Sequence, residues 1–215
     1  MGSSRLPGKV LRKIGNLPLL GHVLGRLKNI KSNASIVVAT TIKTEDDDIV
    51  DYCKNNSVAY FRGSELDVLA RYYDCAKEND FKHIVRLTSD NPFTDVKELD
   101  RLIASHIEEN NDYTHSFGSL PIGVGAEIFT FNALERSYHE GKQANHREHV
   151  NEYIQELPNE FKIGSLPIEN NKISSDLRLT VDTEDDYKRA CYIVKNSNNN
   201  WITTEDAIKL CLESA

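Results

Sequence analysis

The chain begins with a segment whose residue types suit phosphate binding. It reads GSSRLPGK from Gly2 to Lys9. Glycine allows a ligand to approach the backbone closely, and Ser3 and Ser4 supply hydroxyl donors. Arg5 and Lys9 add two positive charges, so the set as a whole suits a triphosphate. A basic surface loop without a ligand has the same composition, and the segment alone leaves both interpretations open.

A second candidate is Asp90, which lies in the stretch RLTSDNP after an apolar run. A carboxylate at the carboxyl end of a strand, just before the turn made by Pro92, is well placed to hold Mg²⁺ against phosphates. The alternative is an Asx turn, in which the carboxylate bonds only to neighbouring backbone groups.

The third candidate is Asp182, in the stretch LRLTVDTEDDY. Acidic clusters at helix starts are usually caps, and Thr183 with Glu184 to Asp186 fits that role here. Asp182 precedes the cap and ends an apolar segment that we interpret as a strand, so its side chain is available for a metal site.

Short apolar runs alternate with helical patterns in the first half of the chain. The expected strands are residues 35–41, 58–61 and 83–88. The expected helices run from Leu17 to about Ile30, from the cap Thr44 (with Asp47 completing a capping box) to Asn55, through Leu66–Ala76, and from the cap Asp95 to Ile107. This alternation predicts an α/β fold of three layers with a mainly parallel, doubly wound sheet.

The second half is less regular. We expect a strand at 126–131, extended segments at 161–168 and 177–182, helices near 132–141 and 146–157, two closing helices from Thr183 and Thr204, and a turn at 196–200. No repeat divides the chain, so residues 1–215 are interpreted as one domain.

Composition excludes several classes of protein. Hydrophobic residues make up 39% and charged residues 27%, as in globular proteins, and no apolar run approaches the roughly 20 residues of a membrane span. A net charge of −7 argues against sequence-independent nucleic-acid binding. The four scattered cysteines show neither zinc spacing nor a disulfide pattern, which indicates reduced thiols in the cytoplasm.

The charge is unevenly distributed. Residues 1–44 contain eight Lys and Arg but no acid, because the first acidic residue is Glu45. The N-terminal segment is therefore expected to face an anion. Five of these cations could instead form a solvated face: Arg12, Lys13, Arg26, Lys28 and Lys31.

Taken together, the motifs resemble the cytidylyltransferase family, which includes the synthetases of CMP-KDO and CMP-sialic acids, and most closely its bacterial spore-coat-polysaccharide branch. The resemblance runs from residue 2 to about residue 190. Its motifs, in family order, are GSSRLPGKVLRKIGNLPLLGHVLGRL, IVVATT, FRGSELDVLARYY, HIVRLTSDNPF, REHV and LRLTVDTEDDY.

The resemblance implies roles for particular residues. The loop that holds the CTP phosphates would contain Ser3, Ser4, Arg5 and Lys9. The segment near base and ribose would be Arg62, Gly63 and Ser64, with Arg71 on the next helix. The aspartates that hold Mg²⁺ would be Asp90 and Asp182, and the groups acting in catalysis would be Lys9, Arg5 and Asp90.

The chain departs from the family pattern at two positions. Thr41 and Gly125 stand where many relatives have aspartate, which affects one predicted nucleotide contact and the sugar pocket. Glu127, Arg147 and His149 are the remaining candidates for the sugar pocket. Alternatively, Arg147 and His149 are exposed helix residues, and Glu127 pairs with one of them.

The resemblance also implies an activity and a fold like that of nucleotide-diphospho-sugar transferases. An acidic 2-keto-3-deoxy sugar would react with CTP to give a CMP-sugar and pyrophosphate, with Mg²⁺ as cofactor, in a cytoplasmic homodimer. Two alternatives remain: another nucleotidyltransferase or nucleotide-sugar glycosyltransferase, and a non-catalytic relative that serves as a binding module.

Family members have a first, central strand directly before the phosphate loop, ending in Ala-Arg. This chain has no residues before Met1 that could form it. An empty central position would leave buried backbone groups unpaired, each at a cost of about 1–3 kcal/mol. We therefore expect Met1 to be an internal methionine of a longer chain that starts roughly ten residues upstream. We also expect the 215-residue chain to be poorly soluble or inactive without an upstream β-rich segment.

Overall fold

The computed structural model describes residues 1–3, 5–197 and 201–213. Its strands are β1 (Lys13–Ile14), β2 (Leu17–Pro18), β3 (Val37–Thr41), β4 (Ala59–Gly63), β5 (His83–Arg86), β6 (Tyr113–His115), β7 (Glu127–Thr130) and β8 (Ile163–Ser165). Its α-helices are α1 (Leu19–Leu27), α2 (Asp47–Asn55), α3 (Val68–Glu78), α4 (Val96–Glu108), α5 (Phe131–Glu140), α6 (Ala144–Glu148), α7 (Glu152–Glu156), α8 (Glu184–Asn196) and α9 (Thr204–Glu213). Short 3₁₀ turns are η1 (Lys9–Leu11), η2 (Thr44–Asp46) and η3 (Asn170–Lys172).

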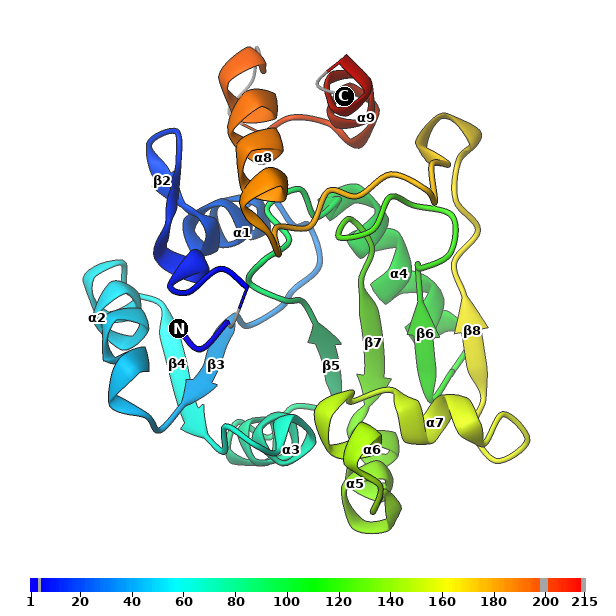
Figure 1. The fold of residues 1–215 in the computed structure, drawn as a ribbon. Helices are drawn as coiled ribbons and strands as arrows, with labels where there is room; N and C mark the ends of the chain where they lie inside the picture. Colours follow the sequence, from blue (N-terminus) through cyan, green and yellow to red (C-terminus); the bar gives the residue numbers. More distant parts are fainter. Residues whose placement is uncertain (4, 198–200, 214–215) are drawn as a thin grey trace.

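Helices cover both faces of the strands, as the sequence predicted for an α/β fold (Figure 1). Neighbouring strand residues point to opposite faces because side chains alternate along a strand. On β5, Ile84 packs with helices α3 and α5 on one face. The next residue, Val85, packs with α1 and α4 on the other face. The three-layer expectation is therefore confirmed.

The strand pairing is mixed. β3 and β4 run parallel, and β6 and β8 run parallel. β7 runs antiparallel to both of its neighbours, β5 and β6, so the four-stranded sheet has the order β5-β7-β6-β8. The parallel component is thus confined to the outer pairs of strands.

The β3–β4 sheet and the four-stranded sheet are not joined by strand pairing. Among the described residues, β3 pairs only with β4, and β5 pairs only with β7. A cavity of about 810 Å³ lies between β3 and β5, lined by both strands and by residues of α1, α3 and α4. No strand of the described residues pairs with β3 or β5 across this cavity.

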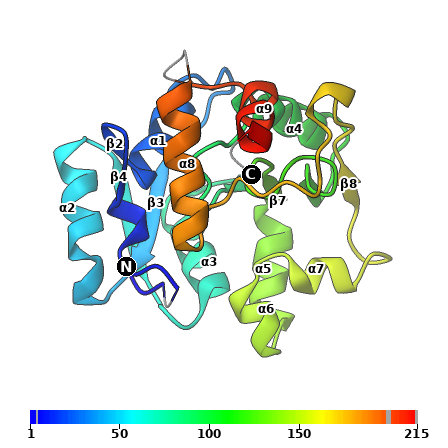
Figure 2. The ribbon, with the colours of Figure 1, turned by 45° about the horizontal axis from the view of Figure 1, so that its top comes forward.

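The C-terminal helices pack against the N-terminal part of the chain. Figure 2 shows α8 between the β1–β2 hairpin and α9, and α8 contacts both. One apolar cluster joins Leu6 and Ile14 to Ala190 and Ile193 of α8. This packing brings the segment before α8 close to the N-terminal loop.

Two buried cations fix these C-terminal elements. Lys172 is 3.0 Å from Asp95 and 2.7 Å from Glu98, and Thr204 of α9 donates to Asp95 at 2.7 Å. Arg26 is also buried and donates to the carbonyl oxygens of Pro92 and Ile202, so the solvated-face interpretation is wrong for this residue. Burial lowers the pKa of Arg26 to about 10.

Several predicted element boundaries are wrong. The first helix starts at Leu19, because Leu17–Pro18 forms β2. Helix α2 has no side-chain cap, and the Asp47 carboxylate pairs with Arg62 at 2.7 Å instead of completing a box with Thr44. Leu66 is 88% exposed and precedes helix α3.

The predicted helix at 146–157 is broken into α6 and α7. His149 has an extended backbone, and Val150 turns into the core with 0% exposure. The segment 177–182 forms only a single bridge, between Arg178 and Ile122, and no strand. The predicted caps Asp95 and Thr183 are confirmed, whereas residues 198–200 of the predicted turn lie outside the described residues.

The described residues contain no helix that is long and apolar enough to cross a membrane. None of the four cysteines forms a disulfide.

A buried histidine pair joins α4 to the sheet. His106 is 0% exposed, and its two ring nitrogens lie 3.0 Å from Thr114 Oγ1 and 3.1 Å from His83 Nδ1. Burial, together with the neighbouring His83, lowers the pKa of His106 from 6.5 to about 4.

We therefore predict that acid weakens the fold through His106. Between pH 6.5 and about 4, His106 binds a proton in the unfolded chain but not in the folded chain. The free energy of unfolding therefore decreases as the pH drops through this window. The expected loss is on the order of 2–3 kcal/mol. Urea unfolding at pH 7.5, 6 and 5 should show a smaller pH dependence for His106→Gln than for wild type. The exposed His139→Gln should behave as wild type, and an equal pH dependence in all three proteins would contradict the prediction.

Candidate active site

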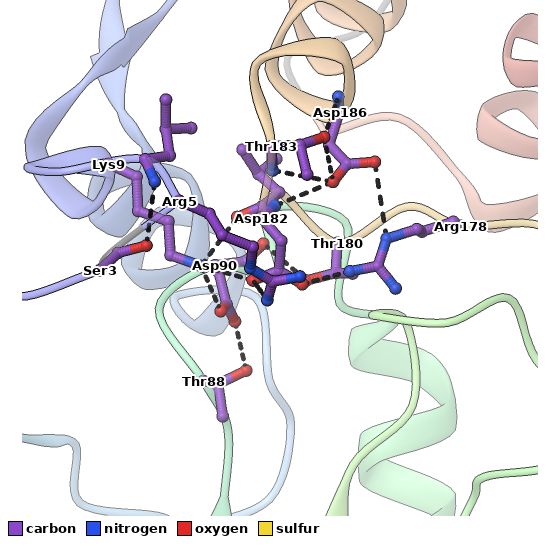
Figure 3. Close-up of polar contacts among 12 residues, drawn as sticks. Ser3, Arg5, Lys9, Thr88, Asp90, Arg178, Thr180, Asp182, Thr183 and Asp186 are labelled. Atoms are coloured by element: carbon purple, nitrogen blue, oxygen red, sulfur yellow. Dashed lines mark hydrogen bonds and ion pairs between the residues drawn. The ribbon is translucent and has the colours of Figure 1, made fainter.

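Two aspartates far apart in the sequence converge on one lysine (Figure 3). Lys9 Nζ donates to Asp90 Oδ2 and to Asp182 Oδ1, each at 2.8 Å. The three side chains are 10%, 23% and 17% exposed, so the cluster is largely shielded but still reached by solvent. The structure therefore brings these three predicted site residues together, and their roles toward phosphate and metal stay predictions.

Backbone hydrogen bonds hold the two aspartates side by side. Val181 N donates to the carbonyl oxygen of Asp90 at 2.9 Å, and the Val181 carbonyl accepts from Lys9 Nζ at 2.9 Å. Thr88 Oγ1 donates to Asp90 Oδ1 at 2.6 Å. Among the described residues, the Asp90 carboxylate thus contacts the side chains of Thr88 and Lys9 rather than the neighbouring backbone groups of an Asx turn.

The helix cap next to Asp182 leaves that carboxylate free to face the site. Thr183 and Asp186 form the capping box of α8. The Asp182 carboxylate instead contacts Lys9 and Arg5. Burial opposes its ionisation, but Lys9, Arg5 and Arg178 outweigh that effect and hold the pKa of Asp182 below its usual value.

The N-terminal loop wraps around this cluster. Gly8 has φ of +70°, a left-handed conformation that favours glycine, and it begins the turn η1 that carries Lys9. Leu6 is buried in the apolar cluster with α8, and its N–H donates to Ser3 Oγ at 3.2 Å. Arg5 is 63% exposed and lies 3.3 Å from Asp182. The predicted phosphate contact Ser4 lies outside the described residues.

Arg178 is a site residue that the sequence reasoning missed. Its guanidinium pairs with Asp182 and lies 3.5 Å from Asp186. With Arg5 and Lys9 it makes three cations around Asp182 (Figure 3). The sequence signal that could have identified Arg178 is an arginine within an apolar segment that ends in aspartate.

The donor set at this point fits a magnesium ion. Among the described residues, no group of three or more His, Cys, Asp or Glu side chains is arranged to hold a metal. Mg²⁺, however, commonly binds through one or two carboxylates plus water and substrate phosphates. Asp90 and Asp182 already share one cation, the Lys9 ammonium, which shows that their carboxylates can converge on a single positive centre.

The residues predicted to lie near the base and ribose surround the end of β4. Arg62 donates to the Thr41 carbonyl at 2.8 Å and to the Lys43 carbonyl at 2.6 Å, so it holds the loop after β3. Ser64 Oγ accepts from Asp67 N at 3.1 Å, and its carbonyl accepts from Arg71 at 2.5 Å. Gly63 lies at the end of β4, and the nucleotide contacts of this segment stay predictions.

Among the described residues, no hydrogen bond or ion pair joins the three candidates for the sugar pocket to one another. Glu127 is fully buried and pairs with Arg86 at 2.5 Å and Tyr113 at 2.7 Å, so the suggested pairing with Arg147 or His149 is wrong. Arg147 pairs with Asp67 of the α3 cap instead.

His149 is exposed and lines the cavity between β3 and β5, which agrees with the alternative of an exposed residue at a helix end.

The departures from the family pattern have structural reasons. Thr41 donates to Asp46 at 2.6 Å, which fixes the end of β3. A Cβ at Gly125 would lie 3.0 Å from the Ser116 carbonyl oxygen, so a side chain at this position would crowd the backbone.

Comparison with known proteins decides the family. The family profile described as cytidylyltransferase matches residues 1–210. The chain belongs to the cytidylyltransferase family. The prediction made from the motifs is therefore confirmed.

Individual relatives agree with this family assignment. An uncharacterized protein of Methanocaldococcus jannaschii is 43% identical over 187 residues, covering 87% of this chain and 76% of that protein. The spore coat polysaccharide biosynthesis protein SpsF of Bacillus subtilis is 35% identical over 193 residues, covering 87% of this chain and 80% of that protein. A solved cytidylyltransferase from Leptospira borgpetersenii is 33% identical and superposes with a TM-score of 0.92, covering 99% of this chain and 90% of that one.

We predict that Lys9 of this cytidylyltransferase acts on the phosphates of the nucleotide. Lys9→Ala should weaken CTP binding about tenfold more than CMP binding, because a hydrogen bond to a charged group contributes about 1.5–3 kcal/mol. Calorimetric titration of both nucleotides measures this difference. Lys188→Ala, which removes a lysine that is 69% exposed, serves as the control and should change neither affinity. Equal weakening of CTP and CMP binding by Lys9→Ala would place Lys9 at the base or the ribose.

Proposed function

We propose that this chain transfers the cytidylyl group of CTP to the anomeric hydroxyl of an acidic 2-keto-3-deoxy sugar. The products are the CMP-sugar and pyrophosphate, and the product serves the synthesis of a surface polysaccharide or glycan. The single observation that carries the proposal is the convergence of Asp90 and Asp182 on Lys9 beside the Gly8 turn. Family membership identifies CTP as the nucleotide donor.

Asp90 and Asp182 would hold a Mg²⁺ ion, the cofactor that we propose for the reaction. When bound, the ion would neutralise charge on the triphosphate and on the departing pyrophosphate. The two carboxylates each lie 2.8 Å from one cationic group, and the backbone of Val181 bonds to that of Asp90 and precedes Asp182. They therefore need no large movement to share a cation.

Lys9 and Arg5 would bind the phosphates. Lys9 now neutralises the two aspartates, and a second cation at that point would repel its ammonium. The flexible lysine stem allows the ammonium to turn toward the β- and γ-phosphates instead. Arg5 is exposed, and its contact with Asp182 is 3.3 Å long. The Arg5 guanidinium could therefore turn toward the phosphates together with Lys9. The residues would thus act by positioning the triphosphate and by stabilising the charge that develops on it.

The sugar is the less constrained part of the proposal. The likeness to a spore coat polysaccharide biosynthesis protein supports a sugar acceptor. The acidic 2-keto-3-deoxy type follows from the motif resemblance, and a carboxylate on the sugar would require a positively charged partner. Arg147 and His149 at the end of α6 stay the candidates for that role, while buried Glu127 supports the pocket through Arg86 and Tyr113. A cytoplasmic homodimer remains a prediction from the same resemblance.

A pyrophosphate-release assay across acceptors tests the function. We expect CTP with an acidic 2-keto-3-deoxy sugar to release pyrophosphate and form the CMP-sugar, and we expect ATP, GTP and UTP to be poor donors. Turnover only with the 1-phosphates of neutral sugars would indicate another kind of nucleotidyltransferase. CTP binding without turnover on any acceptor would indicate a non-catalytic relative.

We predict that either aspartate is indispensable for turnover. Asp90→Asn and Asp182→Asn should each abolish Mg²⁺-dependent pyrophosphate release and change the free energy of unfolding by no more than about 1 kcal/mol. The small effect on stability is expected because asparagine keeps an acceptor for Lys9 and the other carboxylate remains. Asp185→Asn, at a carboxylate that is 85% exposed on the same helix end, is the matched control and should retain turnover. Normal turnover of either site variant would remove that residue from the proposed metal site.

A further inference from the structure

The two oxygens of the Asp182 carboxylate contact different cations (Figure 3). Oδ1 accepts from Lys9 at 2.8 Å and lies 3.3 Å from Arg5, so this oxygen faces the N-terminal loop. Oδ2 accepts from the guanidinium of Arg178. Each oxygen of Asp182 is therefore bonded to a group from a different segment of the chain.

The backbone of Arg178 is held on two sides. Arg178 forms a parallel bridge with Ile122, and the next residue, Leu179, donates its N–H to the Ile122 carbonyl at 2.8 Å. The carbonyl oxygen of Arg178 accepts from Arg189 of α8 at 3.4 Å. The Arg178 side chain is 38% exposed, so its place beside Asp182 follows from polar contacts rather than from burial.

The buried carboxylate of Asp186 holds Arg178 and Asp182 together. Asp186 Oδ1 lies 3.5 Å from Arg178 Nε and 3.0 Å from Arg189 Nη1. Asp186 Oδ2 accepts from the backbone N–H groups of Asp182 at 3.1 Å and of Thr183 at 3.0 Å. The capping box of α8 needs only the contacts with Thr183, so the ion pair of Asp186 with Arg178 is additional to the cap.

These contacts decide which oxygen of Asp182 faces the site. The torsion that turns the plane of an aspartate carboxylate has a broad energy minimum, so it does not fix the plane by itself. Asp186 fixes the backbone of Asp182, and Arg178 fixes its Oδ2 atom. Oδ1 is thereby left toward Lys9 and Asp90.

A metal ion at the position of the Lys9 ammonium would find one oxygen of Asp182 available, because Oδ2 is bonded to Arg178. This arrangement suits Mg²⁺, whose ligands lie near right angles to one another. The two oxygens of one carboxylate are too close together to fill two such positions. The arrangement disfavours Ca²⁺, which takes more oxygen ligands and often uses both oxygens of a carboxylate.

We propose that Arg178 determines the metal selectivity of this site, because it keeps Asp182 from binding a cation through both oxygens. The inference rests on the proposed function, in which Asp90 and Asp182 hold Mg²⁺. Arg178 acts through Asp182 and is a positioning residue. Its positive charge lowers the affinity for every divalent cation, whereas its bond to Oδ2 sets the preference between a small cation and a large one.

Competition for bound Mn²⁺ tests the proposal without relying on turnover. The electron paramagnetic resonance signal of free Mn²⁺ measures its release from the complex of the chain with CTP as Mg²⁺ or Ca²⁺ is added. The ratio of the Ca²⁺ and Mg²⁺ affinities is then compared between wild type and Arg178→Met. The preference of CTP itself is the same for every protein and cancels. We expect Arg178→Met to shift the ratio about tenfold toward Ca²⁺, because one further charged oxygen becomes available to this ion.

Three more variants separate this role from general effects of charge and packing. Arg178→Ala removes the same contact with a smaller side chain and should shift the ratio in the same direction. Arg178→Lys keeps a cation that can bond to Oδ2 and should keep a ratio near that of wild type. Arg12→Met is the matched control, since it removes an arginine that pairs with Glu184 at the start of the same helix. This control should leave the ratio unchanged.

The outcomes distinguish this inference from the proposed function. Mn²⁺ binding that Asp182→Asn does not weaken would remove the proposed metal site and this inference with it. If Asp182→Asn weakens Mn²⁺ binding but Arg178→Met and Arg178→Ala keep the wild-type ratio, the metal site stands and the role of Arg178 is wrong. An equal shift of the ratio in Arg12→Met would also contradict this role, because the loss of one charge would then explain it.

Discussion

The contact of Lys9 with Asp90 and Asp182 is the interaction on which the site depends. It joins the N-terminal loop to the loop after β5 and to the segment before α8. Asp90 and Asp182 lie 81 and 173 positions from Lys9 in the sequence. Two carboxylates brought this close without a cation would repel each other and become harder to ionise. The lysine offsets that repulsion, and our proposal assigns the same point to a magnesium ion during turnover.

The C-terminal helices make this contact possible. Asp182 precedes α8, and the capping box of Thr183 with Asp186 fixes the direction of the chain there. Farther from the site, Lys172 between Asp95 and Glu98 binds the chain after β8 to α4. Removing one partner from such a buried group leaves an uncompensated charge, so these ion pairs define one arrangement of the elements rather than adding much stability.

The cavity between β3 and β5 lies next to the same site, because Thr88 and Ser89 also line it. β3 ends at Thr41, which bonds to Asp46, and the loop after β5 carries Thr88 and Asp90. The loop after β5 therefore connects the wall of this cavity to the Asp90 carboxylate, and a catalytic site tolerates little displacement of its groups.

The sequence alone determined the α/β fold, the family and the grouping of Lys9 with Asp90 and Asp182, because these follow from short local patterns and from motifs kept in order. It did not determine contacts between distant segments. Arg26 had the composition of a surface cation but is buried, and Glu127 pairs with Arg86 rather than with Arg147 or His149. The antiparallel β7 and the break at His149 were likewise decided by tertiary packing, because strand order, core volume and charge pairing depend on which surfaces meet in the folded chain.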